Sequence, residues 1–299
     1  MGLEATKTEE AIVAPRFASW PGAQEGFVTL PEGRMRYLRA GSGPKLVLLH
    51  GLLGYSFSWR LNMTELARHR TVLAVDQLGT GFSDRPENLD CSMRGVAERT
   101  LDFLDQEAEG PFDLLGTSHG GSIAVWVAGM LARRGNSRLQ RLILVAPANP
   151  WSEHGRVLAP FVTQPHVSAA FRWTVPRIRF AWGLFLRRLY ADTSKIPPGT
   201  LEGYAAPFMI PGSLEYGLKV LETWLPDLEA MKISLAHLGA VPTSLIWGGA
   251  DPAVVPESAE PLRQHFRNCE CVSLPNIGHL PYEEAPTDFN RAVTEFLNK

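Results

Sequence analysis

Apolar residues along this chain gather in short runs, separated by longer segments in which they keep a helical spacing. A short run that is apolar without alternation is typical of a strand buried on both faces, as in a parallel sheet with helices on each side. Runs of this kind lie at residues 46–49, 72–75, 114–115, 142–145 and 244–247. They predict an α/β domain built on a mostly parallel central sheet.

An antiparallel hairpin is expected before the first of these runs. Residues 27–30 and 35–39 flank Pro31, Glu32 and Gly33, and such turn residues between two strand-like segments predict a hairpin. With this hairpin included, residues 142–145 form the sixth strand of the chain.

Helices are predicted in the segments between the strands. Two apolar sets keep the spacing of one helix face: Ala97, Leu101 and Leu104, and Phe289, Val293 and Phe296. Residues 123–134 are apolar nearly all round, which predicts a buried helix.

Between the sixth strand and the strand at residues 244–247, about ninety residues contain no strand-like run. The segment is too long and too apolar for a surface loop. We therefore expect a helical cap at residues 151–240, placed over the carboxyl ends of the strands, where sites form in open α/β sheets. The expected domains are an N-terminal tail at 1–25, a core at 26–150 and 241–299, and this cap.

Composition narrows the choice of partners. The chain has 299 residues, with 29 lysines and arginines against 31 acidic residues, a formal charge of −2. This balance argues against nucleic acid as a partner. No stretch approaches the roughly 20 apolar residues that a membrane span needs. Cys91, Cys269 and Cys271 form no metal-ligand pattern, and the last two share a strand face, so we expect free thiols and a cytoplasmic protein.

The most informative motif is Gly116-Thr117-Ser118-His119-Gly120, which lies between a predicted strand and a predicted helix. In a strand–turn–helix context, this G-x-S-x-G pattern places a serine hydroxyl on a sharp, exposed turn. The turn strains the central residue, and side chains at the flanking glycines would collide where the strand folds back into the helix. Asp251 and His279 follow in the chain order Ser…Asp…His, so a serine nucleophile with its base and acid is predicted.

Four further motifs each follow a predicted strand: His50-Gly51-Leu52, residues 76–84 (D-x-x-G-x-G-x-S-D), residues 247–252 (WGGADP) and residues 278–281 (GHLP). In this order the motifs resemble those of the α/β-hydrolase family, with the oxyanion loop first and the acid and histidine loops last. The resemblance covers the chain from about residue 27 to 297. It implies an α/β-hydrolase fold, flanked by helices and capped after the sixth strand, in a serine-nucleophile, esterase-like member.

Each predicted site residue has a chemical role. A serine hydroxyl needs a base to take its proton, an imidazole can return that proton to the leaving group, and a carboxylate orients the ring. We assign Ser118 as nucleophile, His279 as base and Asp251 as acid. Backbone N–H groups of Leu52 and His119 are expected to hold the oxyanion. This chemistry implies neither a metal nor an organic cofactor.

Alternatives exist for several residues. Some family members carry the acid after the preceding strand, but residues 146–149 offer no carboxylate, which favours Asp251. His50 is interpreted as a brace for its loop. The arginine cluster could bind an anionic substrate, although a solvated helix face is the preferred interpretation. Its members are Arg172, Arg177, Arg179, Arg187 and Arg188.

The leading functional hypothesis is hydrolysis of a carboxylic ester or related acyl compound through an acyl-serine intermediate, with a small apolar acyl molecule as substrate. The family's dehalogenases and epoxide hydrolases use a nucleophilic aspartate, where this chain has Ser118. A carbon–carbon bond hydrolase of diketone-type substrates is the nearest alternative. A proline-specific aminopeptidase is weaker, because residues 52–54 read Leu-Leu-Gly in place of Gly-Pro-Gly. A non-catalytic scaffold is a further alternative, and the oligomeric state stays open.

Overall fold

The computed structural model describes residues 22–174, 183–184 and 186–299. Most of the expected tail at 1–25 and two of the clustered arginines, Arg177 and Arg179, therefore lie outside the described residues. The described strands are β1 (Gln24–Leu30), β2 (Gly33–Ala40), β3 (Lys45–Leu49), β4 (Thr71–Val75), β5 (Phe112–Thr117), β6 (Leu139–Val145), β7 (Thr243–Gly248) and β8 (Cys269–Leu274). β1 begins at Gln24, inside the segment that was predicted as a tail.

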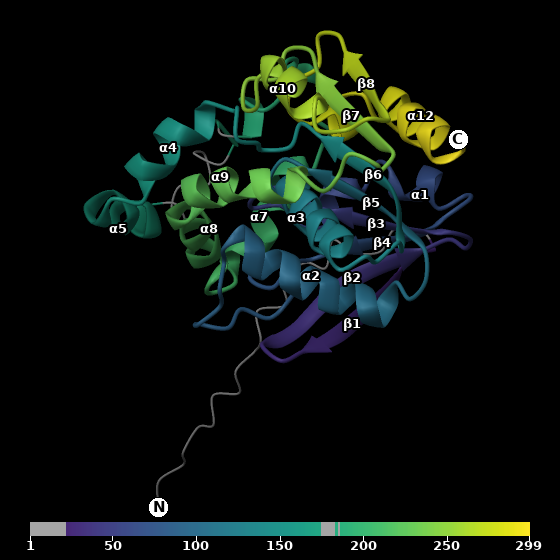
Figure 1. The fold of residues 1–299 in the computed structure, drawn as a ribbon. Coiled ribbons are helices and arrows are strands. Elements are labelled where there is room, and N and C mark those ends of the chain that lie inside the picture. The colour runs from purple at the N-terminus through teal and green to yellow at the C-terminus, as the bar shows by residue number, and fades with distance from the viewer. Residues whose placement is uncertain (1–21, 175–182, 185) are drawn as a thin grey trace, which may run out of the picture.

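The strands form one eight-stranded sheet in the order β1-β2-β4-β3-β5-β6-β7-β8. β1 pairs with β2 and β2 with β4 in antiparallel register, and all other neighbours are parallel. The predicted hairpin and the predicted mostly parallel sheet are thus confirmed (Figure 1).

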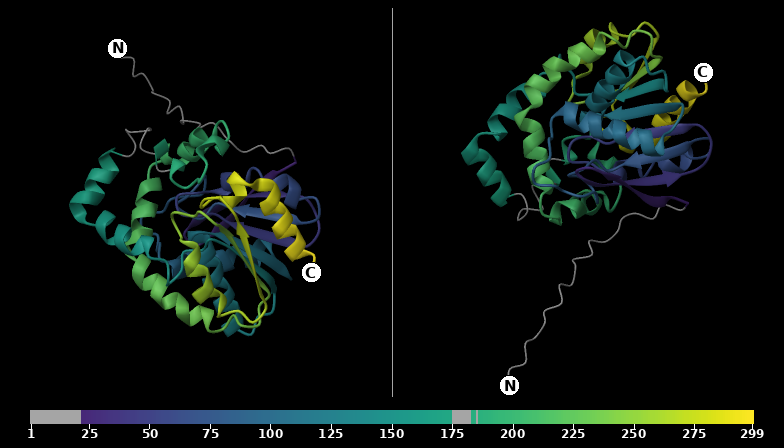
Figure 2. Two further views of the ribbon diagram at one scale, coloured as in Figure 1. Left: turned by 90° about the horizontal axis from the view of Figure 1, so that it is seen from above. Right: turned by 60° about the horizontal axis from the view of Figure 1, so that its bottom comes forward.

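Helices cover both faces of the sheet (Figures 1 and 2). The described α-helices are α1 (Met63–Leu66), α2 (Met93–Glu107), α3 (His119–Arg133), α4 (His154–Val162), α5 (Pro165–Thr174), α7 (Thr200–Ala205), α8 (Ser213–Glu222), α9 (Trp224–Leu235), α10 (Ala259–Arg263), α11 (Pro281–Glu284) and α12 (Pro286–Leu297). Short 3₁₀ turns lie at η1 (Ser56–Trp59), η3 (Thr193–Lys195), η4 (Ala206–Met209) and η5 (Pro256–Ser258).

Alternate residues of β6 show why its run is apolar without alternation. Leu142 and Leu144 pack in the core that includes α2 and α3, whereas Ile143 and Val145 pack in the core that includes α12. All four are fully buried. Each strand face therefore contributes to its own hydrophobic core, as expected for a parallel sheet covered on both sides.

The insertion after β6 is helical, as predicted, and comprises α4 to α9 within the described residues. Its earlier helices lie together beyond one end of the sheet (Figure 2). Its last helix, α9, packs instead against α3: Ser234 lies where a side chain on Gly129 would stand. The boundaries 151 and 240 of the cap stay a prediction. Over the described residues, every helix is too short or too polar to cross a bilayer.

Candidate active site

Ser118 stands alone between the end of β5 at Thr117 and the start of α3 at His119. Its φ of 51° and ψ of −121° are unusual for a residue other than glycine, and this is the strain that the motif predicts. A Cβ on Gly116 would collide with the backbone of Gly120, and one on Gly120 would collide with the carbonyl of His50. Both glycines are required for the close approach of these chain segments.

Asp251 and His279 meet at the carboxyl ends of β7 and β8. The Nδ1 atom of His279 lies 2.7 Å from Oδ2 of Asp251, and both residues are buried, at 4% exposure each. The other oxygen of Asp251 accepts hydrogen bonds from the N–H groups of Ala253 (2.8 Å) and Val254 (2.9 Å). The carboxylate is therefore held from both sides, and Nδ1 of the imidazole is occupied. Nε2 is left for another partner.

The loop after β3 approaches the serine closely. A Cβ built on Gly51 would lie 3.3 Å from Cβ of Ser118 and 3.9 Å from its Oγ. The loop turns through Leu53, whose φ is 61°, and closes with a hydrogen bond from Gly54 N–H to the carbonyl of Gly51 at 2.9 Å. Within the described residues, the N–H groups of Leu52 and His119 donate to no acceptor.

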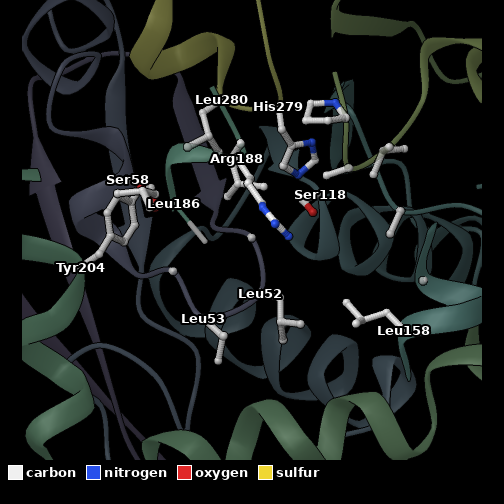
Figure 3. Close-up of a pocket in the computed structure, with 18 of the residues that line it drawn as sticks. Leu52, Leu53, Ser58, Ser118, Leu158, Leu186, Arg188, Tyr204, His279 and Leu280 are labelled. Carbon is white, nitrogen blue, oxygen red and sulfur yellow. The ribbon is translucent and has the colours of Figure 1, made fainter. Parts of the chain in front are cut away.

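A cavity of about 540 Å³ joins these residues. Ser118, His279, Leu52 and Leu53 all face it, together with apolar side chains of the insertion such as Leu158 (Figure 3). The hydroxyl of Ser118 makes no hydrogen bond to a described residue, and it lines the pocket together with His279. Of the predicted residues, Ser118, His279 and Leu52 thus line one mostly apolar pocket, and Asp251 contacts it through His279.

Residues 46–292 match the model of the alpha/beta hydrolase family. This chain belongs to that family.

Among curated relatives of this family member, haloalkane dehalogenase 2 of Mycobacterium bovis is 27% identical over 276 residues, covering 88% of this chain and 91% of the relative. Pimeloyl-[acyl-carrier protein] methyl ester esterase of Nitrosospira multiformis is 28% identical over 279 residues, covering 86% and 95%. 2-Hydroxy-6-oxo-2,4-heptadienoate hydrolase of Pseudomonas putida is 26% identical over 273 residues, covering 86% and 90%. These names span several kinds of bond cleavage.

The fold is also shared with Cfl2 of Burkholderia cenocepacia, with a TM-score of 0.80 and 23% identity over 92% of this chain and 96% of that one. At this identity the likeness concerns the fold alone. The expected α/β-hydrolase fold with a helical insertion after β6 is confirmed.

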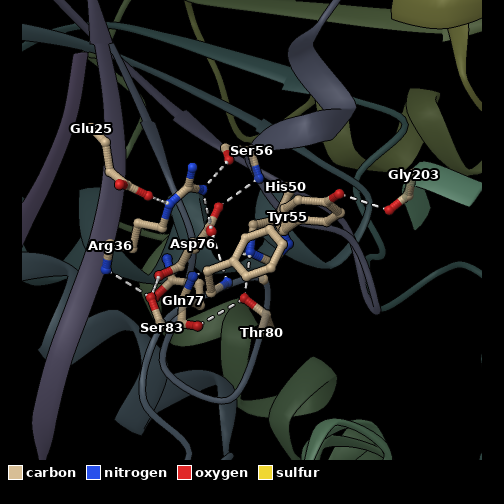
Figure 4. Close-up of polar contacts among 12 residues, drawn as sticks. Glu25, Arg36, His50, Tyr55, Ser56, Asp76, Gln77, Thr80, Ser83 and Gly203 are labelled. Carbon is tan, nitrogen blue, oxygen red and sulfur yellow. Dashed lines mark hydrogen bonds and ion pairs between the residues drawn. The ribbon is translucent and has the colours of Figure 1, made fainter. Parts of the chain in front are cut away.

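His50 braces the loop that approaches Ser118 in this family member. Its Nδ1 lies 2.8 Å from the carbonyl of Gly51, and its Nε2 accepts from the N–H of Gln77 at 3.3 Å. An Nε2 that accepts from a backbone N–H carries no proton, so the proton is on Nδ1 and donates to Gly51. Complete burial lowers the pKa of His50, which keeps the ring neutral. Figure 4 shows the ring against Thr80, whose hydroxyl lies 3.0 Å from Nε2.

Asp76 organises the neighbouring loop after β4. Its carboxylate pairs with Arg36 at 2.8 Å and accepts hydrogen bonds from the N–H groups of Ser56 (2.7 Å) and Phe82 (3.0 Å) (Figure 4). It is fully buried and does not line the pocket, in keeping with the role of loop former that the sequence predicts.

The side chain of His119 has a different environment from its backbone. Its ring stacks on Trp224 with centroids 5.8 Å apart. Burial, with a further contribution from His50, lowers the pKa of His119 to about 3. The ring is therefore neutral, and only the N–H of this residue is available to a ligand at Ser118.

Two residues of the site make contacts that the sequence does not specify. Arg188, one of the clustered arginines, is exposed, as a solvated face requires, and it also lines the pocket. Glu284 accepts hydrogen bonds from the N–H groups of Gly278 (2.8 Å), Ala191 (3.1 Å) and Asp192 (2.8 Å), and so joins the histidine loop to the cap. Over the part of the chain that the structure describes, no cluster of potential metal ligands is present.

Proposed function

We propose that this protein is a serine hydrolase that cleaves a carboxylic ester, or a related acyl compound, through an acyl-serine intermediate. One observation carries the proposal: the strained turn at Ser118 and the imidazole of His279, which is hydrogen-bonded to Asp251, face a single pocket. A hydroxyl in this position gains a nearby imidazole whose orientation and tautomer are fixed by a carboxylate.

In the proposed reaction, Oγ of Ser118 attacks the carbonyl carbon while Nε2 of His279 takes the hydroxyl proton. The resulting oxyanion is held by the N–H groups of Leu52 and His119, which have no other acceptor among the described residues. The intermediate then collapses, the proton passes from His279 to the departing alkoxide, and an alcohol leaves. Water, activated by the same imidazole, attacks the acyl-serine and releases the acid. No metal or organic cofactor is needed for any step.

The walls of the pocket support a small, mostly apolar acyl group as substrate. Leucine, alanine and aromatic side chains from both core and insertion line the space around Ser118. Apolar walls with a few convergent polar groups are typical of small-molecule sites. The similarity to pimeloyl-[acyl-carrier protein] methyl ester esterase agrees with an ester as the scissile group.

The test is turnover of short p-nitrophenyl esters by wild-type protein and by Ser118→Ala. We expect hydrolysis by the wild type, loss of at least a thousandfold in kcat for the variant, and labelling of Ser118 by a fluorophosphonate probe. Equal activity in the two proteins would refute the assignment. Absence of both turnover and labelling would favour a non-catalytic scaffold.

A second candidate is cleavage of a carbon–carbon bond next to a ketone. It is favoured by the similarity to 2-hydroxy-6-oxo-2,4-heptadienoate hydrolase, and it would use the same three side chains. A panel of esters, amides and diketones, each assayed with wild type and Ser118→Ala, separates the two reactions. An amide panel also covers the proline-specific aminopeptidase, which Leu52-Leu53-Gly54 does not favour.

Haloalkane cleavage is disfavoured despite the dehalogenase relatives. Displacement of a halide by a serine hydroxyl would form an ether, which has no carbonyl carbon for water to attack. A carboxylate nucleophile would form an ester, and water can hydrolyse that ester at its carbonyl carbon. Ser118 therefore suits acyl transfer.

A cytoplasmic location stays a prediction, in keeping with three free cysteines.

A further inference from the structure

Arg188 brings a positive charge into a pocket that is otherwise uncharged. Among the described lining residues it is the only lysine or arginine, and no aspartate or glutamate accompanies it. Figure 3 shows its side chain extending into the space that Ser118 and His279 also face. The sequence did not distinguish this arginine from its neighbour Arg187, which does not line the pocket.

The guanidinium of Arg188 has no protein partner in the described part of the chain. Its only hydrogen bond there comes from the backbone, where its N–H donates to the carbonyl of Leu184 at 3.3 Å. The other titratable groups of the lining are His279, Tyr204 and Tyr282. Burial raises the pKa of both tyrosines, so neither phenol supplies a negative charge. A cation that protrudes from apolar walls without a counter-ion is available to an anion from outside.

The position of Arg188 is fixed by the histidine loop. The next residue, Leu189, accepts a hydrogen bond from the N–H of His279 at 2.7 Å. A Cβ on Gly278 would lie 2.6 Å from the N atom of Ala191, so the two backbones are in direct contact. Glu284 adds hydrogen bonds to Ala191 and Asp192. The arginine therefore keeps a set position relative to the imidazole, although its side chain is exposed to solvent.

We propose that Arg188 binds a carboxylate carried by the substrate, so that the preferred substrate is a half-ester of a dicarboxylic acid and not a purely apolar ester. This inference rests on the proposed ester hydrolysis at Ser118. The ester carbonyl lies at Ser118, the carbon chain lies along the leucine-lined wall, and the distal carboxylate meets the guanidinium. The planar fork of an arginine matches the two oxygens of a carboxylate with parallel N–H donors.

The first experiment compares two esters of the same shape. One is the p-nitrophenyl half-ester of adipic acid, and the other carries an isopropyl group in place of the free carboxylate. We expect Arg188→Gln to lower kcat/KM for the half-ester by about tenfold or more relative to its effect on the neutral ester, mainly through KM. Arg188→Lys should recover part of the loss, because it keeps the charge without the fork.

Arg187→Gln is the matched control, since it removes the adjacent exposed charge outside the pocket and should leave the ratio of the two esters unchanged. An equal effect of Arg188→Gln on both esters would overturn the inference. So would the same change of ratio in Arg187→Gln, because it would indicate a general surface potential and not a subsite.

A second measurement does not depend on turnover. Binding of the intact half-ester and of the neutral ester is measured by calorimetry in Ser118→Ala, with and without Arg188→Gln. The inference requires about tenfold weaker binding of the half-ester alone when Arg188 is removed. If Arg188→Gln leaves the affinity for the half-ester unchanged, the inference is overturned even if Ser118-dependent hydrolysis is confirmed. Conversely, selective binding without any turnover by the wild type contradicts the proposed function and leaves the subsite standing.

Discussion

The backbone N–H of His279 donates to the carbonyl of Leu189 at 2.7 Å, so the loop of the predicted base is hydrogen-bonded directly to the helical insertion. His279 is thus held by the core through Asp251 and by the cap through Leu189. The cap is therefore part of the framework that positions the imidazole, besides being a cover for the pocket.

The contact at Gly278 can be tested by adding a single methyl group. Gly278→Ala places a Cβ against the carbonyl of Leu189 and 2.6 Å from Ala191 N, so the loop or the cap must shift. Because a displacement of about 1 Å can cost about a hundredfold in rate, we expect kcat to fall by one to two orders of magnitude on the p-nitrophenyl esters.

Gly239→Ala is the control for this substitution, since its Cβ would meet nothing nearer than 3.6 Å. It should leave kcat within twofold. Unchanged kcat in Gly278→Ala would contradict a role of the cap contact in positioning His279.

Asp251→Asn tests the orientation of the imidazole. The amide can still accept from Ala253 and Val254 through its oxygen, but it then presents an NH₂ donor to Nδ1 of His279 and favours the wrong tautomer. A comparable change in a Ser-His-Asp site lowers kcat by about 10⁴, and we expect a loss of this order.

The matched control is Asp288→Asn, an exposed carboxylate that pairs with Arg291 on α12. Steady-state assays on the same ester measure kcat for both variants. A loss below tenfold in Asp251→Asn would exclude this carboxylate as the orienting acid.

The sequence predicts Ser118, Asp251 and His279 because each follows a strand, and the carboxyl ends of parallel strands lie at one edge of the sheet. The supporting residues obey a similar logic: Asp76 comes directly after β4, which ends at Val75. Strand ends are marked by local apolar runs, so their chemistry can be located without knowing the tertiary structure.

No local apolar run or strand end marks the position of Arg188 in the sequence. It stands in a segment with five arginines between residues 172 and 188, and its place depends on how the chain crosses the histidine loop. That crossing is set by long-range contacts, such as Glu284 with Ala191, which no spacing rule reports. The sequence therefore predicts that the cap lies over the site, but it does not predict which individual side chains of the cap line the pocket.

Acid should destabilise the protein through His119. Its pKa is lowered to about 3 by burial, whereas the unfolded chain binds a proton near pH 6.5. The free energy of unfolding therefore falls as the pH drops from about 6.5 towards about 3. Between pH 7 and pH 5 this one group should remove about 2 kcal/mol from the free energy of unfolding.

Urea denaturation at both pH values, with wild type and His119→Leu, measures the effect. The variant should lose about 2 kcal/mol less than the wild type on acidification, whatever its stability at pH 7. His237→Gln changes an exposed histidine and should follow the wild type. Parallel pH dependence in wild type and His119→Leu would show that the ring of His119 does not titrate as inferred.

The buried pair of Arg36 and Asp76 gives a further prediction, on stability. Burial alone would lower the pKa of Arg36, but Asp76 and Glu25 together raise it above its ordinary value. Asp76→Asn removes the charge that faces the guanidinium. It also places an amide donor either against Arg36 and the N–H of Phe82 or against the N–H of Ser56. Because breaking a buried ion pair leaves an uncompensated charge, we expect a loss of about 3 kcal/mol in the free energy of unfolding.

Breaking a buried ion pair typically costs about 3–5 kcal/mol. We expect the lower end of this range because Glu25 also contacts Arg36, at 2.5 Å, and keeps part of its charge compensated. Asp84→Asn in the same loop is the control. Its side chain is 46% exposed, and its loss should cost under 1 kcal/mol. If urea denaturation gave the same small loss for both variants, Asp76 would not be the residue that holds this loop. The side chain of Asp76 would then only fill the space beside Gly81.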